Sequence, residues 1–230
     1  MDRIIPDARL RAALLTLAGS SGVCLAMLAG RTYFAVRLEL GFYPWNLLLA
    51  WIPLLLAARI YALRARRSPR TGLLALCALL WFFFFPNAPY IVTDLLHLRT
   101  RAPIPKWFDL VMMVSFAWTG LCLGYLSLHL LQEVVRARWG ARWGWRFVVG
   151  MLAASSFGIY LGRFERWNSW DVFARPFGLV NDVVQLGNFA SNPEALAFCA
   201  TFFAFSLLSY FPLCALIRLH DGPAGESPRG

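Results

Sequence analysis

Apolar residues run in long blocks along this chain, and charged residues collect between the blocks. A helix rises about 1.5 Å per residue, so about 20 apolar residues cross the hydrocarbon core of a membrane. Six blocks are long enough, or nearly so, and lie near 12–30, 45–63, 72–92, 108–131, 146–162 and 195–217. The pattern predicts an all-α fold, a polytopic transmembrane helical bundle of about six spans. We expect one domain over residues 1–220 and a disordered tail at 221–230.

Two prolines interrupt the third block, which reads WFFFFPNAPYIVTDLLHLR. Neither Pro86 nor Pro89 has an amide hydrogen to donate, so a continuous helix must break or kink there. Pro89 suits the first turn of a restarted helix, where the missing donor costs nothing. We therefore expect a third span broken at Pro86/Pro89, which is a recurring way to build a polar site in a membrane.

A polar stripe follows this break. If a short helix restarts after it, Tyr90, Asp94 and His97 are spaced i, i+4 and i+7 and share one face. Asn87 lies just before that helix begins. Charged groups are costly to bury in lipid unless they are paired, hydrated or functional, so the stripe is a candidate site.

The fifth block ends abruptly in charged and aromatic residues, within the stretch GIYLGRFERWNSWD at 158–171. The groups that it provides are Arg163, Glu165, Arg166, Trp167, Asn168, Trp170 and Asp171. Indole rings favour headgroup depth, so we expect this stretch at the membrane edge. Beyond it, Pro176 and helically spaced apolar residues predict an interfacial helix near 176–188, either a lid over the polar residues or a plain connector.

With six spans, the first, third and fifth loops share one side of the membrane. The third and fifth loops hold the polar residues described above, and the first adds Glu39, Tyr43, Trp45 and Asn46. The remaining loops are mostly arginine, tryptophan, glycine and proline. We therefore predict a polar pocket that opens between spans two, three and five.

Small residues recur at four-residue spacing, which allows helices in lipid to approach closely. They are Ala18, Gly22 and Ala26 in the first block, Gly120 and Gly124 in the fourth, and Gly158 and Gly162 in the fifth. We predict that they form helix-packing faces. The chain shows no convincing internal repeat, which leaves an inverted-repeat transporter without support.

Composition agrees with a membrane protein. Hydrophobic residues make up 59% of the chain and charged residues 15%, and the mean hydropathy is +0.57. These values lie outside the range of soluble globular domains. The five cysteines sit inside apolar blocks and form no C-x-x-C pair, so they predict neither a disulfide framework nor a zinc site.

The net charge of +10 comes largely from arginines that flank the apolar blocks. Most of them belong to the N-terminus, the second and fourth loops and the tail, so both termini are expected in the cytoplasm. The segment RARWGARWGWR at 136–146 resembles an interfacial basic belt. Its charge is explained better by anionic lipid than by nucleic acid. Membrane lipid is therefore an expected partner, and nucleic acid is not.

The chain also resembles a known family in four stretches, which are WNLLLAWIPLLLA at 45–57, FFPNAPYIVTDLLHL at 84–98, WFDLVMMVSFAWTG at 107–120 and GIYLGRFERWNSWD at 158–171. Over roughly residues 30 to 215 it is similar to the bacterial integral membrane proteins of domain of unknown function 1361. The resemblance implies a multi-pass protein of the bacterial inner (cytoplasmic) membrane. It implies no catalytic residues, so the site must be argued from chemistry.

A metal centre is one hypothesis for the polar residues. Asp94 and His97 are spaced i, i+3, which lets a carboxylate and an imidazole meet one ion. Further ligands would come from Glu39, Asp109, Glu165 or Asp171. One histidine on this face is thin support, so no cofactor is predicted and a divalent metal is the weaker alternative. The plainer interpretation pairs Asp94 with Arg163 or Arg99.

Anion recognition is a second hypothesis. Arg163 and Arg166 would hold a lipid phosphate or a carboxylate, because guanidinium groups make bidentate contacts. The alternative is a structural network, in which these two arginines pair with Glu165 and Asp171 and tie the loops together.

Catalysis is a third hypothesis, and its candidate acid–base groups are Asp94, His97, Glu165 and Asp171. No nucleophile or metalloprotease motif supports it, so whether the protein is an enzyme stays open. The ligand-binding candidates are Asn46, Asn87, Tyr90, Arg163, Arg166, Trp167, Asn168 and Trp170. The expected function is recognition or modification of a lipid-linked, envelope-linked or anionic ligand at the outer leaflet. The alternatives are a non-enzymatic membrane scaffold or assembly factor, and a small transporter.

Overall fold

Helices are the regular elements of the computed structural model, which describes residues 7–35, 40–64, 71–99, 104–167, 174, 178 and 192–220. The α-helices are α1 (Asp7–Ala35), α2 (Phe42–Arg64), α3 (Thr71–Phe84), α4 (Asn87–Tyr90), α5 (Lys106–Trp139), α6 (Ala141–Arg163) and α9 (Pro193–His220). A 3₁₀ helix, η1 (Ile91–His97), follows α4 directly. The predicted tail, and the predicted interfacial helix apart from Gly178, lie outside the described residues.

Among the described residues, six helical segments are long and apolar enough to cross a membrane, which confirms the predicted bundle of about six spans. They are Ala8–Ala35, Phe42–Arg64, Thr71–His97, Lys106–Trp139, Ala141–Arg163 and Pro193–Leu216. The fifth span starts earlier than the apolar pattern indicated, because the arginine-rich segment before it is helical as well. Arginine is a good helix former, and only Gly140, with a φ of 93°, separates α5 from α6.

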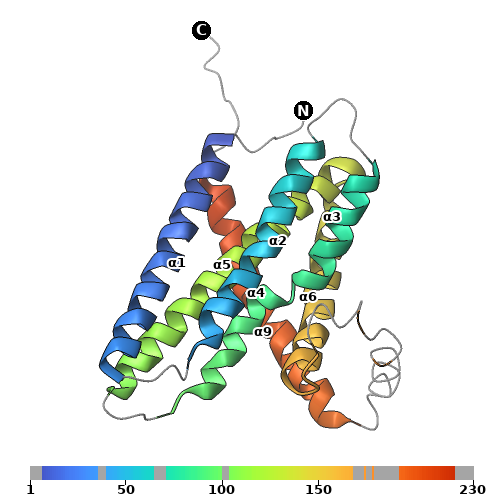
Figure 1. Cartoon of the computed structure of the whole chain (residues 1–230). Helices are drawn as coiled ribbons and strands as arrows, with labels where there is room; N and C mark the ends of the chain where they lie inside the picture. The colour runs from blue at the N-terminus through green and yellow to red at the C-terminus, as the bar shows by residue number, and fades with distance from the viewer. Residues whose placement is uncertain are drawn as a thin grey trace.

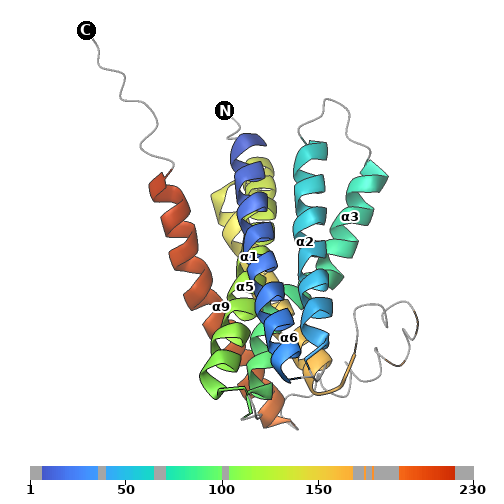
Figure 2. The ribbon, with the colours of Figure 1, turned by 60° about the vertical axis from the view of Figure 1, so that its left-hand side comes forward.

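Successive spans run in alternating directions (Figure 1). We call the end where α1 starts and α9 ends the terminal end; the α5–α6 corner lies there too (Figures 1 and 2). At the opposite end, which we call the site end, lie the end of α6, η1, and the starts of α2 and α5 (Figure 1). Helix α5 is central and contacts α1, α2, α4, η1 and α6, whereas α9 packs mainly on α6. Segments distant in sequence therefore meet at the site end.

The third span is broken at the prolines, as predicted. Helix α3 ends at Phe84, and α4 restarts after Pro86, with Pro89 inside its first turn. The chain then tightens into the 3₁₀ helix η1 instead of continuing as an α-helix. A 3₁₀ helix has three residues per turn, so residues three apart lie one above the other. Asp94 and His97 are therefore aligned along one edge of η1.

Two glycines of α5 let the broken span approach closely. A Cβ atom at Gly120 would lie 2.8 Å from the carbonyl oxygen of Ala88, and one at Gly124 would lie 2.9 Å from the Ala88 Cβ. Real Cβ atoms essentially never come so close, so these positions require glycine while the backbones stay where they are. The predicted packing face of the fourth span is confirmed. At Gly158 on α6, a Cβ would meet Pro86 Cγ at 3.1 Å.

The packing prediction for the first span is wrong. Ala18, Gly22 and Ala26 are exposed, and a Cβ at Gly22 would meet nothing within 4 Å. A different face packs on the bundle, and there Ser21 accepts a 3.1 Å hydrogen bond from Trp51 Nε1. Cys24 lies 3.5 Å from the Thr119 hydroxyl. Polar contacts with neighbouring helices, and not the stripe of small residues, thus set the rotation of α1 about its axis.

Candidate functional site

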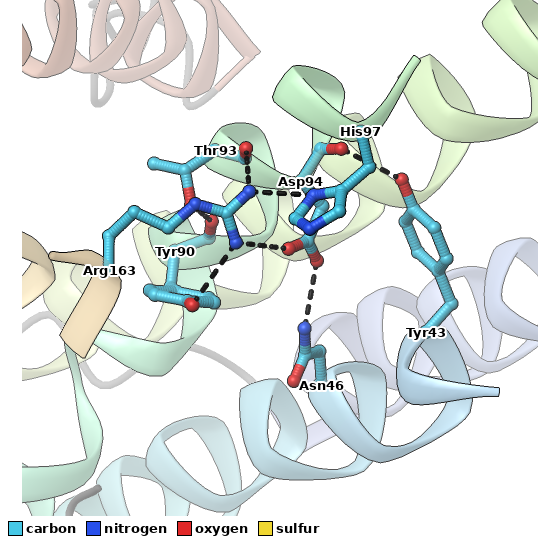
Figure 3. Close-up of polar contacts among 7 residues, drawn as sticks. All are labelled: Tyr43, Asn46, Tyr90, Thr93, Asp94, His97 and Arg163. Carbon is cyan, nitrogen blue, oxygen red and sulfur yellow. Dashed lines mark hydrogen bonds and ion pairs between the residues drawn. The ribbon is translucent and has the colours of Figure 1, made fainter. Parts of the chain in front are cut away.

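Arg163, the last residue of α6, lies at the centre of a polar cluster on the third span (Figure 3). Its Nη1 donates to Asp94 Oδ1 and to the Tyr90 hydroxyl, both at 3.3 Å. Its Nη2 donates to the Thr93 carbonyl oxygen and approaches His97 Nδ1, both at 2.7 Å. The four terminal N–H groups of the guanidinium thus all have protein acceptors. We call the following residues the Arg163 cluster: Tyr43, Asn46, Tyr90, Thr93, Asp94, His97 and Arg163.

The contact with Arg163 fixes the protonation of His97. A guanidinium has no acceptor atom, so the 2.7 Å bond requires His97 Nδ1 to accept. The imidazole must therefore be neutral and carry its proton on Nε2. Its ring packs against Phe42 of α2, with 5.2 Å between ring centroids. His97 is thus a positioned acceptor for Arg163 in this arrangement.

Asp94 is held by two other elements as well as by its own. Its Oδ2 accepts a 2.8 Å hydrogen bond from Asn46 Nδ2 of α2, and its backbone oxygen accepts one from the Tyr43 hydroxyl at 3.3 Å. The residue is only 1% exposed. Burying an unpaired carboxylate costs several kcal/mol, and here both oxygens are bonded (Figure 3). The cluster therefore fastens η1 to α2 and α6.

The local fold explains how the guanidinium reaches its acceptors. Because Arg163 occupies the last turn of α6, its positive charge is favoured by the helix dipole. Gly162 lies next to the Tyr90 ring, and a Cβ there would be 3.4 Å from Tyr90 Cε2, which is an ordinary van der Waals contact. The Arg163 Cζ lies 5.6 Å from the centre of the Tyr90 ring. Tyr90 thus offers both its hydroxyl and its ring face to the same cation.

The remaining candidates from the sequence lie elsewhere. The Asn87 side chain donates to the Phe84 carbonyl at 3.0 Å, across the break between α3 and α4. Glu165 and Arg166 are exposed just beyond α6. The half-buried Trp167 donates its backbone N–H to Leu161 at 3.1 Å. Three further candidates, Asn168, Trp170 and Asp171, lie outside the described residues.

The two proposed metal ligands converge on the arginine. Asp94 and His97 both contact the guanidinium of Arg163, a cation that takes the position in which a metal ion would meet them. Within the part of the chain that the structure describes, no three His, Cys, Asp or Glu side chains are grouped as metal ligands would be. The donor set therefore fits an ion pair better than a zinc-type centre, which needs at least three protein ligands.

Sequence reasoning missed a second buried ion pair at the site end. Arg31 of α1 donates through Nε to Asp109 Oδ1 at 2.7 Å and through Nη2 to Asp109 Oδ2 at 3.3 Å. Their side chains are 1% and 0% exposed. From the sequence, Arg31 was not assigned to a site, and Asp109 was considered only as a possible further metal ligand. The signal was present, because each sits among apolar residues, in LAGRTYF and WFDLVMM.

Two members of the Arg163 cluster were not among the catalytic or ligand-binding candidates, although Tyr43 was named among the polar residues of the first loop. Tyr43 precedes Asn46 by three residues and so shares a face of α2 with it, but the apolar pattern started that span after Tyr43. Thr93 binds Arg163 through its backbone oxygen, for which a side-chain pattern gives no signal, and its hydroxyl donates to the Tyr90 carbonyl at 2.7 Å.

Comparison with known proteins gives a family but no annotated function. The family model described as "Protein of unknown function (DUF1361)" matches residues 45–209. That range includes every member of the Arg163 cluster except Tyr43. No curated protein and no solved structure matches the chain. Because the matched range covers most of the sequence, the chain belongs to the DUF1361 family.

Proposed function

We propose that this protein is a non-enzymatic scaffold or assembly factor of the membrane, and that the Arg163 cluster is an internal clamp. One observation carries the proposal: the ion pair at the centre of the cluster is saturated by the protein itself. All four terminal N–H groups of Arg163 and both carboxylate oxygens of Asp94 have protein partners. A phosphate or substrate would have to displace these partners before it bound the pair.

The clamp joins three elements that are distant in sequence. Arg163 comes from α6, Asp94 from η1 and Asn46 from α2. Removing one partner from a buried ion pair typically costs about 3–5 kcal/mol, because the other charge is left uncompensated. A clamp of this strength keeps the site end in one shape, which suits a surface that another membrane component recognises.

The orientation of that surface follows from the arginine distribution. Arginines are concentrated at the terminal end, and this distribution supports an orientation in a bacterial inner membrane with both termini in the cytoplasm and the site end outside. The surface for a partner would then lie at the outer leaflet. It includes Trp107 at the start of α5, which is 66% exposed.

Photo-crosslinking in native membranes tests the scaffold. A benzophenone amino acid replaces Trp107 or, as a matched control on the same helix, Trp118, which is 64% exposed within the span. We expect Trp107 to give a discrete protein adduct and Trp118 to give lipid adducts alone. The scaffold proposal fails if both positions give lipid adducts alone.

A second candidate function is recognition or modification of an envelope-linked or anionic ligand at the same end. It is favoured by Arg166, which is exposed and has a φ of 61° although it is not glycine. Such a conformation costs about 1–3 kcal/mol and is often found at functional sites. A lipid adduct at Trp107 that is lost on Arg166→Gln would support this candidate over the scaffold.

A further inference from the structure

The α5–α6 corner at the terminal end presents a compact group of arginines and tryptophans. Gly140 forms the corner, and its φ of 93° is readily adopted only by glycine. The side chains that surround it are all exposed: Arg138, Trp139, Arg142, Trp143 and Arg146. We call these five residues the corner patch. It lies at the opposite end of the bundle from the Arg163 cluster (Figure 1).

Two of the arginines lie over indole rings. Arg146 Cζ is 4.9 Å from the centre of the Trp143 ring, and Arg138 Cζ is 5.9 Å from that of Trp139. A guanidinium stacked on a ring directs its N–H groups sideways, in its own plane, so stacking leaves them available to an anion. Arg142 and Arg146 are four residues apart on α6 and therefore face the same way.

The corner patch keeps its positive charge, as far as the described residues are concerned. Arg136, next to the patch, pairs with Glu133 at 3.0 Å. Within the described ranges, Arg138, Arg142 and Arg146 have no acidic side chain at ion-pair distance. Arg142 and Arg146 thus place two positive charges on one face of α6, and Arg138 adds a third at the end of α5, on the other side of the corner at Gly140. The charge complementary to them is that of a phosphate group.

We propose that the corner patch is a binding site for the headgroup of an anionic phospholipid. Two features favour a lipid over free phosphate as the source of that group. Trp139 and Trp143 are 61% and 54% exposed, and indole rings at a helix end anchor at headgroup depth. Val149 and Gly150, further along α6, are also exposed and give the acyl chains an apolar surface. The site is independent of the Arg163 cluster and of its proposed function.

Native mass spectrometry of the purified full chain tests this site, with phosphatidylglycerol and phosphatidylcholine offered in equal amounts. We expect the wild type to retain phosphatidylglycerol preferentially. The triple variant Arg138→Lys, Arg142→Lys, Arg146→Lys keeps the charge and the topology but loses stacking and bidentate contacts. We expect it to retain about tenfold less phosphatidylglycerol, as the loss of about 1.4 kcal/mol would give.

A matched control alters an exposed arginine at the other end, with Arg99→Lys. This variant should retain phosphatidylglycerol like the wild type. The proposal is overturned if the triple-lysine variant binds like the wild type, if the control loses as much lipid, or if neither lipid is preferred. Displacement of the lipid by millimolar inorganic phosphate would also overturn it, because the site would then be one for free phosphate.

Discussion

Arg163 shows how one residue converts a polar stripe into a clamp. From the sequence, an ion pair of Asp94 with Arg163 or Arg99 was the plainer alternative to a metal site. In the structure Asp94 pairs with Arg163 at 3.3 Å. The structure adds acceptors that the pairing alone did not imply, namely the Thr93 carbonyl and the neutral His97 ring. At this scale, the acceptors decide whether the arginine is available to a ligand.

We predict strong energetic coupling between Asp94 and Arg163. Asp94→Asn and Arg163→Gln should each lower the thermal unfolding midpoint in detergent, because each leaves the other residue, the half-buried Arg163 or the buried Asp94, without its ion-pair partner. The double variant should lose less than the two single effects together, with a coupling energy of about 1–3 kcal/mol. Glu165→Gln and Arg166→Gln, which alter exposed residues, should leave the midpoint unchanged. Strictly additive effects of the first two changes would rule out the clamp.

At the scale of an element, the third span shows which features follow from the sequence and which follow from packing. Pro86 and Pro89 predict from the sequence that the helix breaks, because proline cannot donate a backbone hydrogen bond. That the chain continues as a 3₁₀ helix is decided by packing: α5 offers Gly120 and Gly124 to Ala88, and the Arg163 cluster holds the other face. Local sequence preferences alone do not distinguish an α-helix from a 3₁₀ helix over so short a stretch.

Replacing a glycine by alanine should have different effects on stability at the close α4–α5 contact and on the exposed face of α1. Gly120→Ala should destabilise the protein by about 1–3 kcal/mol, because the new Cβ meets a backbone oxygen 2.8 Å away that cannot rotate aside. Gly22→Ala adds the same methyl group to α1, where nothing lies within 4 Å, and should be neutral or slightly stabilising. Thermal midpoints in one detergent compare them. Equal midpoints would show that the α4–α5 contact is looser than described.

At the scale of the whole molecule, the six spans among the described residues alternate in direction, so the helix ends that flank the odd-numbered connections lie at one end (Figure 1). The structure places the end of α6, η1 and the start of α2 together (Figure 1). This agrees with the prediction that the first, third and fifth loops of six spans share one side. Among the described residues, the half-buried pair of Arg163 with Asp94 and the buried pair of Arg31 with Asp109 both join helix ends at this site end. The terminal end carries the corner patch instead. The bundle is therefore chemically polarised along the membrane normal.

This polarity predicts the result of site-specific labelling in a cysteine-free background. Lys106→Cys at the site end should react with a membrane-impermeant maleimide in intact bacterial cells. Ala141→Cys at the terminal end should react only after the cells are permeabilised. Both positions are exposed, so a lack of reaction reports the side of the membrane and not burial. The reverse pattern would invert the proposed orientation, and labelling of both from outside would refute the span count.

The sequence by itself determined the number of spans, the break at the prolines and the grouping of Asn46, Asp94 and Arg163 at one end. These features follow from apolar length, proline chemistry and the parity of membrane crossings, which are properties of local sequence. Tertiary structure alone decided which face of α1 packs, that Arg31 meets Asp109, and that the acceptors of Arg163 all come from the protein. Each of these depends on how a helix is rotated about its axis. In a chain whose spans are apolar on nearly every side, that rotation is set by contacts between helices and not by a hydrophobic stripe.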